Sequence, residues 1–296
     1  MLEGSTGFDY LIRAMTQPTD SILIVTKAGN EQAAALGRAI SAWLKQRRIP
    51  SRTVANTENP DCLETGKSRP GLVLVLGGDG TVLSVVRKLG QQQIPLIGLD
   101  LGRVGFLAEL GRDDWQQGME RVLSGDFETV ERLALEFSVV RDTKVVTTGR
   151  VLNDLVVNRG ALARLIQLEA WCDDNRLGAV RADGLVVFSP TGATAYAVSV
   201  GGPLVHPDLD VFGIAPICPF LSDFRPLILA GQSRVRIRVL EHPDTVYLTL
   251  DGQTGTTLLE GDDILVRKAG KSPLFVSLHK HSYVQRLRSK GYFKER

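Results

Sequence analysis

The pattern of hydrophobic and polar residues changes part of the way along the chain. Up to about residue 125, short apolar runs alternate with segments in which apolar residues recur at helical spacing. The pattern predicts buried strands at 21–27 and 71–76, further strands at 51–55 and 94–100, and helices at 31–48, 81–89 and 112–125. Because parallel strands need crossover connections, this alternation predicts an α/β domain with a parallel sheet covered on both faces.

Beyond residue 125 the pattern is typical of strands. Strand-like runs follow one another, separated by turn residues and with little helical periodicity. These runs lie at 131–141, 150–160, 164–174, 182–190, 233–240, 244–252 and 262–270. Helical spacing returns from His281 to Phe293. We therefore expect an α/β domain at 1–125, a mostly β domain at 126–270, and a C-terminal extension at 271–296 whose helix packs back on the first domain.

Composition and charge narrow the class of protein. Of the 296 residues, 43% are hydrophobic and 23% are charged, as in an ordinary globular protein. The formal net charge of +2 gives no reason to expect nucleic acid or an anionic membrane as the main partner. No apolar run approaches the ~20 residues of a membrane helix. Residues 1–20 lack the apolar core of a secretory signal.

The cysteines and histidines predict neither disulfides nor a metal site. Cys62, Cys172 and Cys218 are few, odd in number and far apart, which fits a reducing cytoplasm. His279 and His281 have no thiol or carboxylate at ligand spacing beside them. The expected location is the cytoplasm.

A glycine-rich turn follows the apolar run 71–76. It reads GGDGT over residues 77–81, at the point where a parallel strand leads into a helix and where ligands of such sheets bind. Glycines let phosphate groups approach backbone N–H groups, and the following helix, expected to start near Thr81, adds unpaired N–H groups. A carboxylate repels bound phosphates, so its presence here indicates a function. It could accept a proton from an attacking hydroxyl or hold Mg²⁺. We therefore interpret Asp79 as a functional residue rather than as a helix cap alone.

The sequence lacks the complete motifs of other nucleotide-binding proteins and of hydrolases. The TGKS at 65–68 resembles the end of a Walker loop, but the first glycine of that loop would be residue 61, which is Asp61. No G-x-G-x-x-G follows the first strand, and the FSPTG at 188–192 lacks the G-x-S-x-G pattern. P-loop, dehydrogenase and hydrolase functions are therefore not expected.

A second group of candidate ligand-binding residues lies in the β-rich part. The segment 181–205 carries the hydroxyls of Thr191 and Thr194, small residues that admit a flat base, and Tyr196, which can stack on that base. Asn153-Asp154 interrupts an apolar strand, and polar residues there must be paired or face a ligand. The LTLDGQ that ends at Gln253 repeats this pattern at another strand end.

Taken together, these segments resemble the NAD kinase family. The resemblance rests on GGDGT, LNDLVV, ADGLVVFSPTGATAYAVSVGGPLV and DGQ in this order and spacing, and it covers the chain from about Ser21 to the C-terminal helix. It implies transfer of the γ-phosphoryl group of ATP, or of polyphosphate, to the 2′-hydroxyl of the adenosine ribose of NAD, which makes NADP. It also implies Mg²⁺ or another divalent cation, and a homodimer or homotetramer.

The resemblance also implies roles for individual residues. Asp79 would accept the proton of the 2′-hydroxyl, with Gly80 beside the substrate. The phosphate and ATP side would comprise Gly77, Gly78, Gly80, Thr81 and Asp251. The NAD contacts would comprise Asp79, Gly80, Asn153, Asp154, Arg164, Arg181, Asp183, Thr191, Thr194, Ala195, Tyr196, Ser199 and Gln253. No residue is assigned with certainty to a metal.

Some positions depart from the family pattern. Ala193 stands where many members have Ser, and Asp100 replaces a frequent Asn. Phe220-Leu221 replaces the usual His-Thr or His-Ser. These departures bear on substrate preference.

Two other functions stay open at this point. GGDGT also occurs in phosphofructokinases and in lipid kinases, although their further motifs are missing here. A catalytically silent NAD(P)-binding sensor would keep the same pocket. Intact Asp79 and Asp251 favour the enzyme.

Overall fold

The computed structural model describes residues 21–59, 63, 69–102, 105–160, 164–240, 245–279 and 282–293. The chain divides into two compact units. The first comprises Met1–Val82, Ile94–Glu131 and Leu274–Arg296, and the second comprises Leu83–Gln93 and Arg132–Pro273. The sequence-based domain boundaries near 125 and 270 stay a prediction. The residues 1–20, Cys62, the TGKS at 65–68 and His281 lie outside the described residues.

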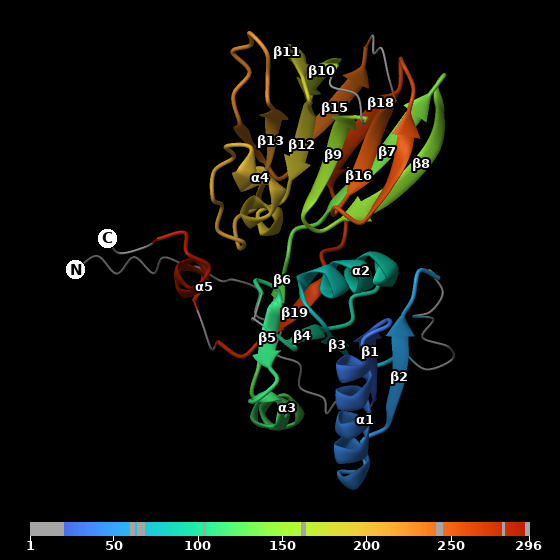
Figure 1. The fold of residues 1–296 in the computed structure, drawn as a ribbon, viewed down its shortest axis with the longest axis vertical. Helices are drawn as coiled ribbons and strands as arrows, with labels where there is room; N and C mark the ends of the chain where they lie inside the picture. Colours follow the sequence, from blue (N-terminus) through green and yellow to red (C-terminus); the bar gives the residue numbers. More distant parts are fainter. Residues whose placement is uncertain are drawn as a thin grey trace, which may run out of the picture. The chain divides into compact units, whose positions relative to one another are not determined.

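The first unit is built on one seven-stranded sheet (Figure 1). Its strands in spatial order are β2 (Ser51–Asn56), β1 (Ile22–Lys27), β3 (Leu72–Leu76), β4 (Leu96–Asp100), β19 (Leu274–Ser277) and β6 (Glu128–Glu131), with β5 (Ala108–Gly111) paired to β4. All pairs are parallel except β19 with β6. The helices are α1 (Glu31–Gln46), α2 (Asp79–Leu89), α3 (Trp115–Leu123) and α5 (Tyr283–Ser289). The last residues of α2 are grouped with the second unit.

Local sequence explains these elements. β1, β3 and β4 are continuous apolar runs because a parallel strand is buried on both faces. Asn30 caps α1 by accepting the N–H of Ala33 at 2.9 Å, and the helix turns its apolar face, with Ile40 and Leu44, to the core.

The second unit contains two six-stranded antiparallel sheets. The first has the order β11 (Asn175–Ala182), β10 (Ile166–Cys172), β15 (Arg234–Val239), β18 (Asp263–Lys268), β7 (Leu135–Arg141) and β8 (Lys144–Val151). The second has the order β14 (Leu227–Ala230), β13 (Val211–Ile217), β12 (Gly184–Phe188), β9 (Asp154–Arg159), β16 (Val246–Leu250) and β17 (Thr254–Leu258). One core of inward-facing residues from both sheets joins them as a sandwich.

The outer face of the second sheet in this unit is also covered. A short 3₁₀ helix at Thr191–Thr194 and the helix α4 (Tyr196–Ser199) lie against β12. Ala193 and Ala197 pack there with Val186 and Phe188.

The predicted fold class is confirmed, with differences in detail. The structure has an α/β unit with a mostly parallel sheet and a mostly β unit, and the C-terminal residues form β19 and α5 of the first unit. α2 begins at Asp79, two residues earlier than predicted. Strands also occur where the pattern predicts none, namely β5, β6, β13, β14, β17, β19 and most of β8 and β11.

Candidate functional site

The GGDGT turn and the start of α2 belong to the first unit. The N–H of Gly77 donates to the carbonyl of Leu99 at 2.9 Å, which holds the turn beside the end of β4. The carbonyl of Gly78 accepts the N–H of Thr81 at 2.9 Å, so the helix is already formed at Asp79. Asp79 therefore projects from the first helical turn rather than from the loop before it.

The carboxylate of Asp79 is held by two backbone donors. The N–H of Phe106 donates to Oδ2 at 2.9 Å and the N–H of Leu107 donates to Oδ1 at 3.0 Å. Gly105 lies against the carboxylate of Asp79, and a Cβ on Gly105 would overlap that carboxylate. A carboxylate offers about four acceptor positions, so each oxygen of Asp79 can still accept a further hydrogen bond.

Asp100 lies at the neighbouring strand end. It is 8% exposed, and its Oδ1 accepts the N–H of Gly102 at 2.8 Å. Its Oδ2 faces Gly78. This departure from the family pattern therefore lies beside the glycine turn and adds a carboxylate there.

In the second unit, the side chain of Asp251 binds the backbone of residues 152–154, where β9 begins. Its Oδ1 accepts the N–H groups of Leu152 at 3.1 Å, Asn153 at 2.8 Å and Asp154 at 3.4 Å. Its own N–H donates to the carbonyl of Asp154 at 2.9 Å. The side chain is fully buried. Asp251 has a φ of +50°, so the turn after β16 keeps the left-handed conformation in which these contacts form. Its predicted position near ATP stays a prediction.

Two buried carboxyl groups thus lie close together. Burial, and then the charge of Asp251, raise the pKa of Asp154 to about 7, while a hydrogen bond from the N–H of Tyr196 acts against this shift. Burial also raises the pKa of Asp251, although the N–H groups of Asn153 and Leu152 and the charge of Arg87 lower it in part. Perturbed carboxyl groups of this kind are more frequent at functional sites than elsewhere.

Arg87 is a contact of this cluster that the sequence did not single out. Its Nη1 lies 3.4 Å from Oδ2 of Asp251, and its Nη2 donates to Oε1 of Gln253 at 2.8 Å. The signal in the sequence is a cation in the last turn of the helix that follows GGDGT. No local pattern indicates that its partner lies 164 residues away along the chain.

The segment with the predicted adenosine pocket lies against the same strand start. The N–H of Ser189 donates to the carbonyl of Asn153 at 2.9 Å, and a Cβ at Gly192 would overlap that carbonyl. The Oδ1 of Asn153 and the Oγ1 of Thr191 are buried without a hydrogen-bond partner among the described residues. Buried polar atoms are rarely left unpaired, so both point to a ligand.

The predicted site residues of the second unit form one set that described contacts join and a second set that lies outside it. Asn153, Asp154, Asp251 and Tyr196 are brought together by the contacts described above. Thr194, Ala195 and Ser199 follow Thr191 in the 3₁₀ helix and α4. Asp183 instead pairs with Arg159, and the carbonyl of Arg181 accepts the N–H of Phe220 at 2.8 Å. Arg164 is exposed and is not joined to either set by a described contact.

The structure locates the remaining departures from the family pattern. Phe220 and Leu221 are 51% and 91% exposed and therefore present apolar surface next to Arg181. Ala193 is fully buried in the apolar cluster with Phe188, so its Cβ faces the core.

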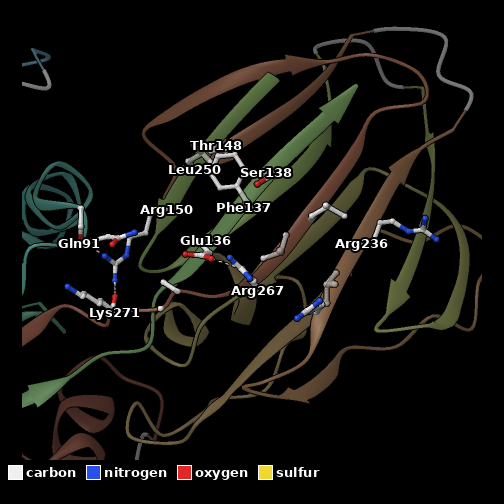
Figure 2. Close-up of a pocket in the computed structure, with 18 of the residues that line it drawn as sticks. Gln91, Glu136, Phe137, Ser138, Thr148, Arg150, Arg236, Leu250, Arg267 and Lys271 are labelled. Atoms are coloured by element: carbon white, nitrogen blue, oxygen red, sulfur yellow. Dashed lines mark hydrogen bonds and ion pairs between the residues drawn. The ribbon is translucent and has the colours of Figure 1, made fainter. Parts of the chain in front are cut away.

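Figure 2 shows a large cavity in the second unit, and Arg87, the partner of Asp251, is among the residues that line it. It has a volume of about 1240 Å³, and none of the predicted site residues lines it. Arg267 pairs with Glu136 at 2.6 Å, and Arg150 donates to the carbonyls of Gly90 and Lys271. Part of the charge that lines the cavity is therefore paired locally, whereas the Nε of Arg150 is buried without a hydrogen-bond partner among the described residues.

Neither a metal-binding cluster nor a helix that could span a membrane occurs among the described residues. In the part of the chain that the structure covers, no three His, Cys, Asp or Glu side chains gather in a way that suits a metal ion. No helix in that part is both long and apolar enough to cross a membrane.

The fold and the GGDGT turn define a two-domain kinase. The sequence matches the family models of the ATP-NAD kinase N-terminal domain over residues 50–127 and of the ATP-NAD kinase C-terminal domain over residues 152–278. It is 48% identical to the NAD kinase of Nitratidesulfovibrio vulgaris (strain DSM 19637 / Miyazaki F), over 93% of this chain and 97% of that one. It is 46% identical to the NAD kinase of Oleidesulfovibrio alaskensis, over 93% and 94%. The chain belongs to the NAD kinase family, which confirms the resemblance, and it is a phosphotransferase.

Solved structures agree on the fold. The yeast NADH kinase complexed with NADH has a TM-score of 0.80 at 24% identity, over 95% of this chain and 90% of that one. The NAD kinase from Archaeoglobus fulgidus in complex with ATP has a TM-score of 0.71 at 22% identity, over 91% and 96%.

Proposed function

We propose that this chain transfers the γ-phosphoryl group of ATP to the 2′-hydroxyl of the adenosine ribose of NAD and so makes NADP. The observation that carries the proposal is the carboxylate of Asp79, held by two backbone N–H groups at the first turn of α2 in a member of this family. ATP is supported as the donor by the relative that was solved with ATP, and NAD(H) as the acceptor by the relative that was solved with NADH.

The chemistry follows from this geometry. Phosphoryl transfer needs alignment and charge neutralisation more than covalent assistance. We place the phosphate groups at Gly77, Gly78, Gly80 and Thr81, where glycines carry no side chain and the N-terminus of α2 attracts anions. The N–H groups of Gly77 and Thr81 themselves donate to the carbonyls of Leu99 and Gly78 and hold the turn. Asp79 would orient the 2′-hydroxyl and accept its proton, which is worth ~10²–10⁴ in rate.

Most of the proposed NAD-binding residues belong to the second unit. Asn153 and Thr191 carry buried polar atoms that the described protein leaves unpaired, and Asp154 lies beside Asn153. Hydroxyl and amino groups of adenosine are suitable partners for such atoms. The proposed NAD contacts remain Asp79, Gly80, Asn153, Asp154, Arg164, Arg181, Asp183, Thr191, Thr194, Ala195, Tyr196, Ser199 and Gln253.

Mg²⁺ or another divalent cation is part of the proposal. Mg²⁺ usually keeps several waters and is bound through substrate phosphates and one or two carboxylates. The described residues hold no dedicated ligand cluster, and Asp100 turns one carboxylate oxygen toward Gly78, so the side chains at the turn fit a cation held mainly by ATP. The cation would neutralise phosphate charge during transfer.

Location and assembly are proposed on the family resemblance. We expect a cytoplasmic homodimer or homotetramer. The free thiols of Cys172 and Cys218 suit a reducing compartment.

The test is NADP formation by the purified chain. Wild type and Asp79→Asn receive NAD, ATP and Mg²⁺, and an NADP-specific dehydrogenase reports the product. In parallel assays, NADH replaces NAD as the acceptor and polyphosphate replaces ATP as the donor. Fructose 6-phosphate and diacylglycerol test for the activities of the other GGDGT kinases. ATP-dependent NADP formation by wild type alone supports the proposal. Binding of NAD without NADP from either donor contradicts it and favours a sensor.

A further inference from the structure

The C-terminal helix α5 meets the segment that holds Asp79, and both belong to the first unit. Ser282 and Gln285 form a capping box at the start of this helix. Leu287 is buried, and the ring of Tyr292 packs edge-on against Phe106 with centroids 6.3 Å apart. The cap and these contacts fix the helix against the residues that precede β5.

Arg286 is the polar contact between α5 and that segment. Its Nη1 donates to the carbonyl of Ala108 at 2.7 Å and to the carbonyl of Phe106 at 3.3 Å. Its Nη2 pairs with Glu109, whose other carboxylate oxygen accepts the N–H of Leu278 at 2.9 Å. The side chains of Arg286 and Glu109 are 17% and 8% exposed, so water screens this pair only weakly.

The same peptide group contacts both Arg286 and Asp79. The carbonyl of Phe106 accepts from Arg286, and the N–H of Leu107, which belongs to that peptide group, donates to Asp79. A hydrogen bond to the carbonyl polarises a peptide group and strengthens the bond that its N–H makes. A chain of hydrogen bonds therefore runs from the guanidinium group through one peptide to the carboxylate.

We propose that Arg286 is a positioning residue for phosphoryl transfer. It holds the peptide between Phe106 and Leu107, and through that peptide it fixes the two N–H groups that orient the carboxylate of Asp79. The inference rests on the proposed role of Asp79 as the base. It assigns to the C-terminal helix a part in catalysis, without contact to the substrate.

The proposal predicts an effect on turnover rather than on NAD affinity. Misplacement of a catalytic group by about 1 Å can lower the rate on the order of 10²-fold. Arg286→Met removes the guanidinium group but keeps much of the apolar stem, so the packing of α5 changes little. We expect kcat to fall at least about tenfold, with KM for NAD within about twofold of wild type.

Two further variants separate positioning from general destabilisation. Arg286→Lys keeps the charge and a donor, and should recover part of kcat. Arg288→Met changes an exposed arginine of the same helix, and should behave as wild type. Amide hydrogen exchange at Phe106 and Leu107 reports the positioning directly, and should speed up in Arg286→Met but not in Arg288→Met.

The outcomes are distinguishable. Normal kcat with unchanged exchange in Arg286→Met overturns the inference, and so does a loss confined to KM for NAD. If wild type makes no NADP, the proposed function fails, and exchange at Phe106 and Leu107 still decides whether Arg286 holds the segment. If Arg286→Met does not fold, Arg286→Gln takes its place, because it removes the charge and shortens the side chain. Normal kcat with unchanged exchange in Arg286→Gln overturns the inference.

Discussion

Asp251 and Asp154 bind each other's backbone. The carboxylate of Asp251 accepts the N–H of Asp154 at 3.4 Å, and the N–H of Asp251 donates to the carbonyl of Asp154 at 2.9 Å. This reciprocal pair ties the start of β9 to the end of β16. It also brings two buried carboxyl groups together, so at least one of them is costly to ionise.

The first prediction concerns pH and Asp154. Burial and the charge of Asp251 raise its pKa to about 7, so the folded protein holds this proton more tightly than the unfolded chain. The resulting stabilisation is complete below the ordinary pKa near 4 and is lost as pH rises through about 7. Between pH 5 and 8, the free energy of unfolding of wild type should fall by about 2 kcal/mol relative to Asp154→Asn. Urea unfolding of both proteins at several pH values measures this difference.

Asp262 supplies a control of opposite sign. Burial acts to raise its pKa, but the ion pair with Arg141 and the N–H of Leu259 outweigh burial and lower it overall. Its contribution is present above the ordinary pKa and is lost only as pH falls through the lowered value. The effect of Asp262→Asn should therefore stay constant between pH 5 and 8. An equally constant difference for Asp154→Asn would contradict the first prediction.

The second prediction concerns Arg87. Removal of its charge leaves the buried carboxylate of Asp251 without a cationic partner, and Gln253 loses a donor. Arg87→Met should lower the free energy of unfolding by roughly 3 kcal/mol near neutral pH. The cost should shrink toward pH 5, because burial raises the pKa of Asp251 and a neutral carboxyl group needs no cation.

Arg267→Met is the matched control for this change. Arg267 also pairs with a carboxylate, but its side chain is 61% exposed. An exposed pair contributes about 0–1 kcal/mol, so this variant should lose little stability. Equal losses in the two variants, measured by urea unfolding, would show that Arg87 contributes no more than a surface cation.

Elements that local sequence determines were predictable, whereas contacts between residues far apart in the chain were not. β1, β3 and β4 are continuous apolar runs, and a buried parallel strand requires such a run, so the first unit was largely predictable. The edge strand β5 has four residues, which are too few for its alternation of buried and half-buried positions to predict a strand. Arg87 and Arg286 find their partners more than 160 residues away, and no local spacing encodes such a pairing.

The third prediction concerns Asp79. Asp79→Asn keeps one oxygen for a backbone N–H but turns an amide group toward the other donor, and it removes the proposed base. Turnover should fall ~10²–10⁴-fold while NAD still binds. Steady-state NADP formation and calorimetric NAD binding measure the two quantities.

Asp100→Asn is the control, because it changes a buried carboxylate at the next strand end to the residue that is frequent in the family. Near-normal turnover of Asp79→Asn would exclude the base role.

The fourth prediction tests the space around Asp79 without a change in its charge. A Cβ at Gly105 would overlap the carboxylate of Asp79, so Gly105→Ala must displace either the segment before β5 or the carboxylate. Overpacking of this kind costs about 1–3 kcal/mol in stability. Because Asp79 loses its orientation, kcat should fall by more than the fraction of unfolded protein explains. Gly270→Ala places a Cβ where no atom lies within 4 Å and should change neither quantity. Urea unfolding and NADP formation on the same samples compare both variants. A stable, fully active Gly105→Ala would mean that the segment before β5 moves to accept the Cβ. Its close approach would then not be what holds Asp79 in place.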